Sequence, residues 1–313
     1  MSRIAVTSRS FSKHPVLREE LLKHYGDVIF NDAGAKLAGN GLIAFLEGRG
    51  KAITALEKFD GGVFSALPEL TVISKYGVGL DMIDLQAMAK HGVKLGWTGG
   101  VNKRSVSELV ISFAVALLRY VPELNAEVKK GVWRQRTGRQ LSGQTVGIVG
   151  CGHIGKDLIR LLQPFGCRTL AHDIRNFPEF YEETQTEPAG LEELLKTADI
   201  VTLHLPLDST TQNILSAERL SWMKPDAILI NAARGGLVDE AALKTLLYEN
   251  RIAGAAFDVF ATEPPEDSDL LNLPNFLVTP HIGGSSAEAI LDMGRAAIKG
   301  LDVNRIPEAG VYP

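Results

Sequence analysis

The chain has 313 residues, 45% of them hydrophobic, so it can form one large domain or two moderate ones. The net charge of −4 and the lack of a basic stripe argue against a nucleic-acid partner. The N-terminus lacks the apolar segment of a secretory signal. No apolar run reaches the ~18 residues that a membrane span needs, so we expect a cytoplasmic protein that does not bind membranes.

The first third of the chain alternates short β-branched runs with segments of helical length. This alternation predicts a parallel sheet with helices on both faces. The expected strands are residues 3–8, 27–31, 51–55 and 70–77, and the expected helices are residues 16–26 and 41–50.

The segment 105–121 is apolar on most sides, so we expect a helix that is buried between larger elements. It begins like a capping box, with Ser105 as the cap and Glu108 three residues later. A polar stretch at 129–144 follows.

A second series of strands and helices occupies the rest of the chain. Six strands alternating with helices match the strand count of a Rossmann domain. We therefore predict an α/β fold of two doubly wound parallel-sheet domains, the second at 103–283 and the first at 1–102, completed by 284–313. The six strands are expected at residues 145–150, 168–173, 199–206, 227–233, 251–260 and 276–281, and a last helix at 285–301.

A glycine-rich turn links strand 145–150 to the next helix. Gly150, Gly152 and Gly155 have the spacing of a dinucleotide-binding loop, with a strand before them and a helix after them. The first glycine allows the tight turn, the second lets a pyrophosphate approach, and the third lets the helix pack. A turn that binds no ligand is the alternative interpretation.

An acid, Asp173, ends the following strand. In this context it is expected to bind the adenosine ribose hydroxyls and to repel a 2′-phosphate, which favours NAD over NADP. The nearby Arg175 weakens that preference. His153 and Ile154 lie in the same loop and are also expected to line the cofactor site, with the side chain of His153 pointing outward.

Three polar residues follow three expected strands of the second sheet: Arg234, Glu263 and His281. Ligands of open α/β sheets bind at the carboxyl ends of the strands. A histidine can take the hydroxyl proton when a hydride leaves the same carbon, and a carboxylate can orient the imidazole. A guanidinium can hold a substrate carboxylate. We predict that these three residues are catalytic; surface positions just past the strand ends are the alternative.

The segments NAARGGLVDE, AFDVFATEPP and TPHIGGSSAEA, which hold these residues, resemble the signature segments of the D-isomer-specific 2-hydroxyacid dehydrogenases. The resemblance extends from about residue 70 to 300, through KYGVGLDMIDL, VGIVGCGHIGK and HLPLDSTT. It implies an NAD-binding Rossmann domain inserted in a flavodoxin-like substrate domain, and a homodimer formed through the NAD-binding domain. It also implies that Arg234 binds the substrate carboxylate, His281 is the acid/base, and Glu263 is its partner.

The resemblance implies further contacts. Asp258 is expected to reach the nicotinamide carboxamide, with a structural cap as the alternative, and His204 is expected to contribute its backbone rather than its imidazole. Lys75 is expected either to hold a second anionic group of the substrate or to be solvated. Asn102 is expected to contact a ligand or to act as a hinge. The other expected contacts are Pro206, Ala232 and Gly283 for the cofactor and Val78 and Gly79, alternatively a plain turn, for the substrate.

The chain departs from the family near residues 98–105, where Lys103 and Arg104 add two charges that are either solvated or favour an acidic substrate. It resembles phosphoglycerate dehydrogenases but ends at residue 313, so we expect a short form without their regulatory domain.

We therefore predict an NAD-dependent D-2-hydroxyacid dehydrogenase that acts on 3-phosphoglycerate or on glyoxylate and hydroxypyruvate. An NAD-sensing regulatory protein on the same fold is the alternative. Cys151 and Cys167 are expected to be reduced thiols, and no cluster of residues has the spacing of metal ligands.

Overall fold

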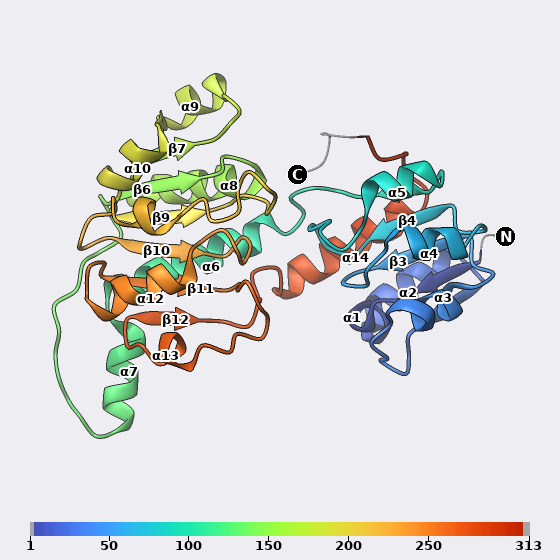
Figure 1. Cartoon of the computed structure of the whole chain (residues 1–313), viewed down its shortest axis with the longest axis horizontal. Helices are drawn as coiled ribbons and strands as arrows, with labels where there is room; N and C mark the ends of the chain where they lie inside the picture. Colours follow the sequence, from blue (N-terminus) through green and yellow to red (C-terminus); the bar gives the residue numbers. More distant parts are fainter. Residues whose placement is uncertain (1–2, 309–313) are drawn as a thin grey trace. The chain divides into compact units, whose positions relative to one another are not determined.

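The computed structural model describes residues 3–308 and divides into two compact units. Unit 1 combines the chain up to Asn102 with the segment that starts at Ser285, and unit 2 is Lys103–Gly284. In Figure 1 the N-terminal elements and the last helix accordingly share one unit.

Unit 1 contains a five-stranded parallel sheet in the order β2-β1-β3-β4-β5, which is the flavodoxin-like order. The order reverses between β1 and β3, so the sheet has its topological switch point there. The strands are β1 (Ile4–Val6), β2 (Val28–Phe30), β3 (Lys51–Thr54), β4 (Val72–Lys75) and β5 (Lys94–Gly96), and the helices are α1 (Arg9–Lys13), α2 (Pro15–His24), α3 (Gly39–Leu46), α4 (Gly61–Ala66), α5 (Leu85–Lys90) and α14 (Ala287–Gly300).

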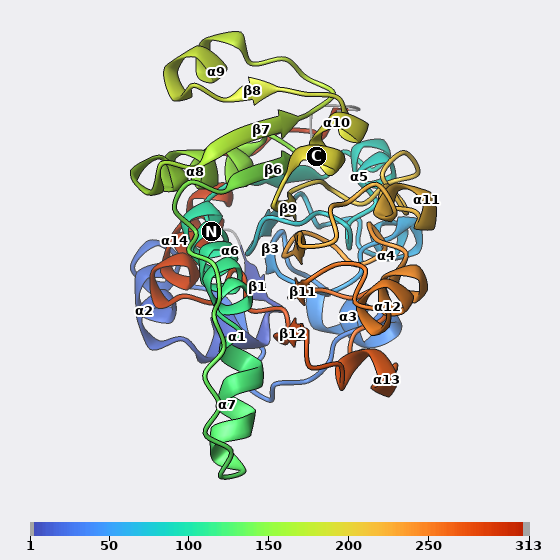
Figure 2. The same cartoon turned by 90° about the vertical axis from the view of Figure 1, so that its left-hand side faces the viewer.

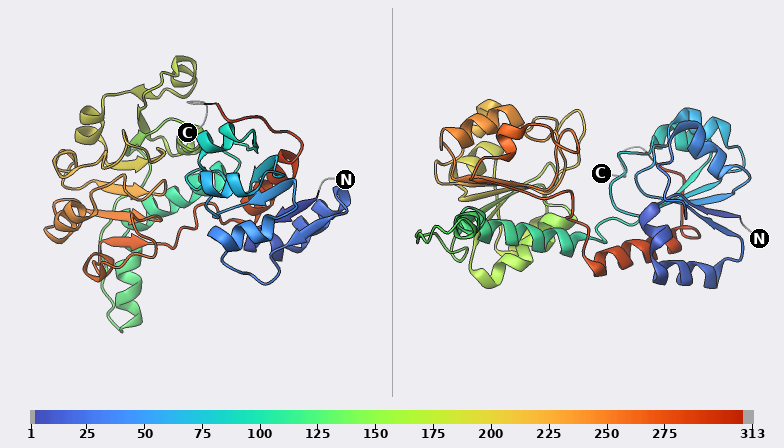
Figure 3. Two further views of the ribbon diagram at one scale, coloured as in Figure 1. Left: turned by 45° about the vertical axis from the view of Figure 1, so that its right-hand side comes forward. Right: turned by 90° about the horizontal axis from the view of Figure 1, so that it is seen from below.

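Helices cover both faces of this sheet, as the right-hand view of Figure 3 shows. One core lies under α1, α2 and α14, and the other lies under α3, α4 and α5. The buried strand residues alternate between these two cores, with Ile4 and Val6 in the first and Ala5 in the second.

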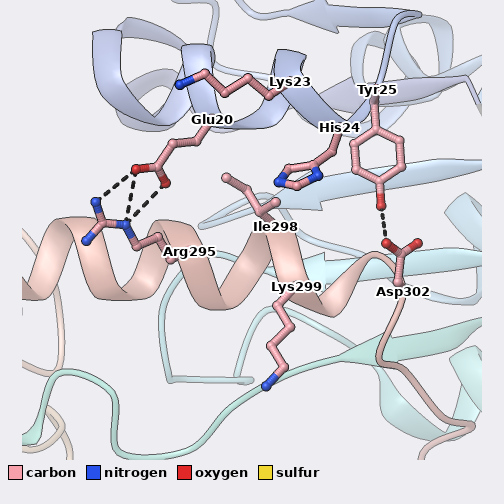
Figure 4. A pocket seen from close by; sticks show the side chains of 8 residues that line it. All are labelled: Glu20, Lys23, His24, Tyr25, Arg295, Ile298, Lys299 and Asp302. Atoms are coloured by element: carbon pink, nitrogen blue, oxygen red, sulfur yellow. Dashed lines mark hydrogen bonds and ion pairs between the residues drawn. The ribbon is translucent and has the colours of Figure 1, made fainter.

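The C-terminal helix α14 is held to the first elements of the chain by polar contacts. Arg295 on α14 forms an ion pair with Glu20 on α2, and Tyr25 donates a hydrogen bond of 2.7 Å to Asp302 (Figure 4). These residues line a surface hollow of about 390 Å³, which lies apart from every residue that the sequence assigned to a site. We interpret the contacts as fastening α14 to unit 1.

Unit 2 contains a seven-stranded parallel sheet in the order β12-β11-β10-β9-β6-β7-β8. Its first six strands in the chain have the Rossmann order, and β12 extends the sheet at one edge. The strands are β6 (Thr145–Val149), β7 (Arg168–His172), β8 (Glu187–Pro188), β9 (Ile200–Leu203), β10 (Ile228–Asn231), β11 (Gly254–Phe257) and β12 (Phe276–Val278).

One face of this sheet packs under α6, α8 and α9, and the other packs under α10 to α13. The predicted α/β class with two parallel sheets is therefore confirmed. The helices are α6 (Lys103–Leu118), α7 (Val121–Lys129), α8 (His153–Leu162), α9 (Pro178–Thr184), α10 (Leu191–Thr197), α11 (Ala217–Leu220), α12 (Glu240–Tyr248) and α13 (Ser268–Leu271), with a short 3₁₀ helix at Gln163–Phe165.

Some sequence predictions were wrong in detail. The predicted capping box fails because α6 begins at Lys103, which places Ser105 inside the first turn, where its hydroxyl donates to the Gly283 carbonyl. The predicted helix 105–121 ends at Leu118, a second helix, α7, follows it, and Val115 is exposed rather than buried. The six predicted strands of the second sheet became seven because the two-residue β8 is too short to give a periodic signal.

Within residues 3–308, no single helix is long and apolar enough to cross a membrane. Together α6 and α7 have such length and composition, but a bend of 63° separates them, and α6 contributes its apolar face to the core of unit 2.

We predict that Gly96→Ala destabilises unit 1 by about 1–3 kcal/mol, the usual cost of overpacking. A Cβ on Gly96 would lie 2.6 Å from the Gly300 Cα and even closer to its carbonyl, and backbone atoms cannot swing away. Urea unfolding followed by circular dichroism measures the loss.

Gly41→Ala is the matched control, because a Cβ there meets nothing within 4 Å and Gly41 lies inside α3. It should leave stability unchanged or raise it by up to about 1 kcal/mol. Equal unfolding midpoints for the two variants would contradict the packing argument.

Candidate active site

Backbone packing explains two of the three glycines in the turn between β6 and α8. Gly150 has φ +102°, and a Cβ there would lie 2.7 Å from the carbonyl carbon of His204. A Cβ on Gly155 would run into the backbone carbonyl of Gly150. Both positions need glycine so that α8 can pack against the strands.

Gly152 has no such packing reason, because a Cβ there would meet nothing within 4 Å. It is the N-cap of α8 and makes no side-chain capping hydrogen bond. A bare helix N-terminus with open space in front of it suits a phosphate group, which accepts hydrogen bonds from the first-turn N–H groups. The loop therefore fits the pyrophosphate of a dinucleotide.

Asp173 lies just past the end of β7 and binds this loop. Its Oδ2 accepts a hydrogen bond of 2.7 Å from the Cys151 N–H, and its Oδ1 accepts one of 2.8 Å from the Arg175 N–H. The same carboxylate that the sequence assigned to the ribose thus also fixes the shape of the turn. Burial raises the pKa of the Cys151 thiol to about 11, so this cysteine is a neutral packing residue.

His204 follows β9 and borders the glycine-rich loop. Its N–H donates to the Val149 carbonyl at 2.7 Å, and its Nε2 lies 3.0 Å from the Thr202 hydroxyl. Its Nδ1 is buried without a hydrogen-bond partner among residues 3–308. Burial lowers the pKa of His204 to about 3, so the ring is neutral.

His153 is an exposed residue, but partial desolvation of its ring, together with the positive charges of Lys103 and Lys156, lowers its pKa. Lys156 itself stacks on the Phe177 ring, 3.5 Å from its centroid.

Residues 3–308 contain no group of three or more His, Cys, Asp or Glu side chains that could hold a metal ion.

The three predicted catalytic residues follow three adjacent parallel strands. In Figure 1, β10, β11 and β12 run side by side in the same direction. Arg234, Glu263 and His281 come after the carboxyl ends of these strands in that order. The structure therefore brings their loops to one edge of the sheet.

The Arg234 loop is shaped by its neighbours. Asn231 ends β10 and bonds to the loop twice, accepting from the Ala233 N–H at 3.1 Å and donating to the Arg234 carbonyl at 2.8 Å. Gly235 packs directly against the Phe260 backbone, where a Cβ would overlap the carbonyl. Because Phe260 lies in the loop that carries Glu263, this contact couples the Arg234 and Glu263 loops.

Glu263 and His281 are hydrogen-bonded, with 2.8 Å between Oε2 and Nδ1. The other oxygen of Glu263 accepts a hydrogen bond of 3.1 Å from the Phe260 N–H, which orients the carboxylate. The side chains of His281 and Glu263 are 51% and 40% exposed, so both remain accessible to a substrate.

His281 has a left-handed backbone, φ +55°, which is uncommon for a residue other than glycine. Asp258, at the end of β11, holds this turn. Its backbone carbonyl accepts from the His281 N–H, and its carboxylate accepts from the Ile282 and Gly283 N–H groups at 2.8 and 2.7 Å and from the Thr279 hydroxyl. Asp258 therefore makes the contacts of the structural cap.

Comparison with known proteins identifies the family. Residues 111–283, more than half of the chain, match the sequence model described as D-isomer specific 2-hydroxyacid dehydrogenase, NAD binding domain. The chain belongs to the D-isomer-specific 2-hydroxyacid dehydrogenase family. The predicted family and its NAD-binding domain are thereby confirmed.

The similarity extends to curated relatives and solved structures. D-3-phosphoglycerate dehydrogenase of Escherichia coli (strain K12) is 41% identical over 239 residues, which cover 74% of this chain and 58% of that protein. The protein of the same name from Methanocaldococcus jannaschii is 38% identical over 230 residues, 72% of this chain and 44% of that protein. The chain thus spans about half the length of these relatives. The crystal structure of TT0316 protein from Thermus thermophilus has 34% identity and a TM-score of 0.83, covering 96% of this chain and 95% of that chain.

The other expected cofactor residues of this dehydrogenase-family chain lie on the same unit. Ala232 is buried just past β10, and Ile154 packs against the core under α6 and α8. The Pro206 carbonyl accepts from the Thr211 hydroxyl at 2.8 Å. Gly283 is bound to Asp258, and a Cβ on it would lie 3.1 Å from the Asp258 Oδ2.

The expected substrate residues belong to unit 1. Lys75 is not solvated, since it is 5% exposed and its ammonium donates to the Ala55 carbonyl. Val78 and Gly79 follow β4, and the Val78 carbonyl accepts from the Trp97 indole N–H at 2.8 Å. The Asn102 Oδ1 is buried without a hydrogen-bond partner in residues 3–308.

Arg104 is not merely solvated, although its side chain is 56% exposed. Its Nε and Nη2 each donate at 2.9 Å to the buried carboxylate of Asp157 on α8, and this hydrogen bonding raises the pKa of Arg104. Sequence reasoning missed Asp157, although an acid in the apolar stripe of a helix is a signal for a buried partner. It also missed Asn231, the one polar residue of a buried strand.

We predict that Asp258→Asn lowers the free energy of unfolding by about 2 kcal/mol, because an amide nitrogen then faces a backbone donor and the charge-assisted hydrogen bonds are lost. Amide hydrogen exchange at Ile282 and Gly283 should accelerate.

The exposed Asp269→Asn in α13 is the control and should change stability by less than about 0.5 kcal/mol. If Asp258→Asn matches it in both stability and exchange, Asp258 does not hold the His281 turn.

Proposed function

We propose that the chain is an NAD-dependent D-2-hydroxyacid dehydrogenase, with unit 2 binding the cofactor and unit 1 binding the substrate. The observation that carries the proposal is the 2.8 Å hydrogen bond between Glu263 and His281, at the sheet edge that also bears Arg234. An acid-paired histidine and an arginine beside a dinucleotide loop are the groups that 2-oxo acid reduction requires.

In this proposal His281 is the acid/base. Glu263 accepts the hydrogen bond from Nδ1–H, so the imidazole presents Nε2 to the substrate oxygen. The carboxylate also stabilises the imidazolium, which gives its proton to the carbonyl oxygen during reduction and regains it during oxidation.

Arg234 binds the substrate carboxylate. Its Nη1 donates to the Ala233 carbonyl at 2.7 Å, which anchors the guanidinium to its own loop. A guanidinium carries five N–H donors in a planar fork, and that fork matches the two oxygens of a carboxylate. Bound this way, the substrate presents its carbonyl carbon in a fixed orientation. NADH supplies the hydride when it is bound, and Asp173 favours it over NADPH.

The proposed substrates are small 2-oxo or 2-hydroxy acids of the 3-phosphoglycerate or glyoxylate and hydroxypyruvate class. The E. coli relative named D-3-phosphoglycerate dehydrogenase supports the first of these. Val78, Gly79, Lys75 and Asn102 are the proposed substrate contacts in unit 1. The two free cysteines are in keeping with a cytoplasmic location.

We predict that His281→Ala lowers turnover at least ~100-fold, the scale of a lost general acid/base, and leaves NADH affinity unchanged. Stopped-flow or steady-state oxidation of NADH with a 2-oxo acid measures the first quantity, and NADH fluorescence titration measures the second.

The exposed His24→Ala in unit 1 controls for loss of any histidine and should retain full turnover. Full turnover by His281→Ala would show that His281 is not the acid/base. NADH binding by the wild type without turnover of any 2-oxo acid would instead favour the NAD-sensing alternative.

The proposed homodimer is supported by α7 and the segment after it, which extend away from the rest of unit 2 in Figures 1 and 2. No residue of α7 is buried, and the Trp133 side chain is 83% exposed. Helices this short are marginal in water without tertiary packing. We propose that a second copy of unit 2 covers this surface, which also includes Val121, Val128 and Val132.

We predict that the wild type has the mass of a dimer in light scattering and that Trp133→Ser shifts it toward the monomer. Tyr248→Ser, which removes another exposed aromatic residue of unit 2, should leave the mass unchanged. A wild type that is monomeric at micromolar concentration would contradict the proposal.

A further inference from the structure

The switch point of the unit 1 sheet is occupied by an acid, Glu57, in the loop after β3. Ligands of open α/β sheets bind outside the carboxyl ends of the strands at the switch point, which here lies between β1 and β3. Thr7 directly follows β1, Thr54 ends β3, and Thr54 pairs with Lys75 at the end of β4. These three adjacent strand ends and the Glu57 loop form the polar surface of this edge.

Glu57 is held in place by three neutral donors on one oxygen. Its Oε2 accepts from the Thr7 hydroxyl at 2.9 Å, the Thr54 hydroxyl at 2.8 Å and the Ala55 N–H at 2.8 Å. Thr7 and Thr54 are fully buried, and the Thr7 hydroxyl lies closer to Glu57 than to its other acceptor, the Ile53 carbonyl at 3.2 Å. The two hydroxyls therefore indicate a carboxylate that is held in a fixed orientation.

The second oxygen, Oε1, accepts no hydrogen bond from residues 3–308, and no basic side chain in that range forms an ion pair with Glu57. Glu57 is only partly buried, so Oε1 remains accessible. A half-buried carboxylate with one oxygen saturated and the other open is an acceptor for a ligand group that donates a hydrogen bond.

Lys75 does not make this edge a phosphate site. Its ammonium donates to the carbonyl of Ala55, the residue whose N–H donates to Glu57. A phosphate next to Glu57 would face a carboxylate that forms no ion pair with a basic side chain of residues 3–308.

We propose that Glu57 is a substrate-specificity residue that accepts a hydrogen bond from a hydroxyl or ammonium substituent of the substrate, and that it disfavours a phosphate in the same place. This inference rests on the proposed dehydrogenase function and narrows its substrate class. Hydroxypyruvate carries such a hydroxyl, pyruvate replaces it with hydrogen, and phosphohydroxypyruvate replaces it with a dianion.

The test is the kcat/KM of NADH oxidation with these three acids. The wild type should prefer hydroxypyruvate to pyruvate by at least ~10-fold, the scale of a hydrogen bond to a charged group, and to phosphohydroxypyruvate by at least as much. Glu57→Gln keeps a carbonyl oxygen for the threonine hydroxyls but removes the charge. This variant should reduce the preference for hydroxypyruvate over pyruvate at least ~5-fold and the preference over phosphohydroxypyruvate at least ~10-fold.

Glu47→Gln, the same change at an exposed position of unit 1, is the control and should leave all ratios unchanged. Melting temperature and NADH affinity show whether each variant is folded. If Glu57→Gln is not folded, the order of kcat/KM for the three substrates with the wild type tests the role of Glu57. A wild type that prefers phosphohydroxypyruvate, or a folded Glu57→Gln with unchanged ratios, overturns the assignment of Glu57 and leaves the dehydrogenase function standing. No turnover of any of the three acids overturns both.

Discussion

The Asp258 carboxylate is the interaction on which the proposed catalytic geometry depends. It is buried at the end of β11, and it binds the backbone N–H groups of Ile282 and Gly283 in the turn after β12. That turn holds His281 in a left-handed conformation that few residues adopt without support. With the turn fixed, the imidazole meets Glu263 in the neighbouring loop, and the pair is oriented before any substrate binds.

A carboxylate that accepts several hydrogen bonds lies at the edge of each sheet. In both units a carboxylate just past the end of a strand gathers donors from neighbouring strand ends, Asp258 in unit 2 and Glu57 in unit 1. Both oxygens of Asp258 accept hydrogen bonds from the protein itself. Glu57 leaves one oxygen open, and we have proposed that it acts on the substrate. Parallel sheets favour such sites because the carboxyl ends of all the strands lie at the same edge of the sheet.

Much of this architecture could be predicted from the sequence because it depends on local pattern. Strand–helix alternation gave the fold class, and the spacing of Gly150, Gly152 and Gly155 gave the dinucleotide loop. Contacts between distant segments left no such pattern. The pairing of Arg104 with Asp157 depends on how α6 crosses α8, so Arg104 was predicted as solvated or substrate-directed. The role of Glu57 depends on strand order, which the sequence does not state.

We have proposed that a hydride passes from NADH to carbon 2 of a 2-oxo acid and that the product is the D-2-hydroxy acid. The most direct measurement is to incubate the wild type with hydroxypyruvate or pyruvate and with NADH that carries deuterium in place of both hydrogens at nicotinamide C4, and to analyse the product by mass spectrometry and chiral chromatography. We expect a D-2-hydroxy acid with one deuterium on carbon 2. An unlabelled or L-configured product, or none at all although NADH is bound, would contradict the proposal.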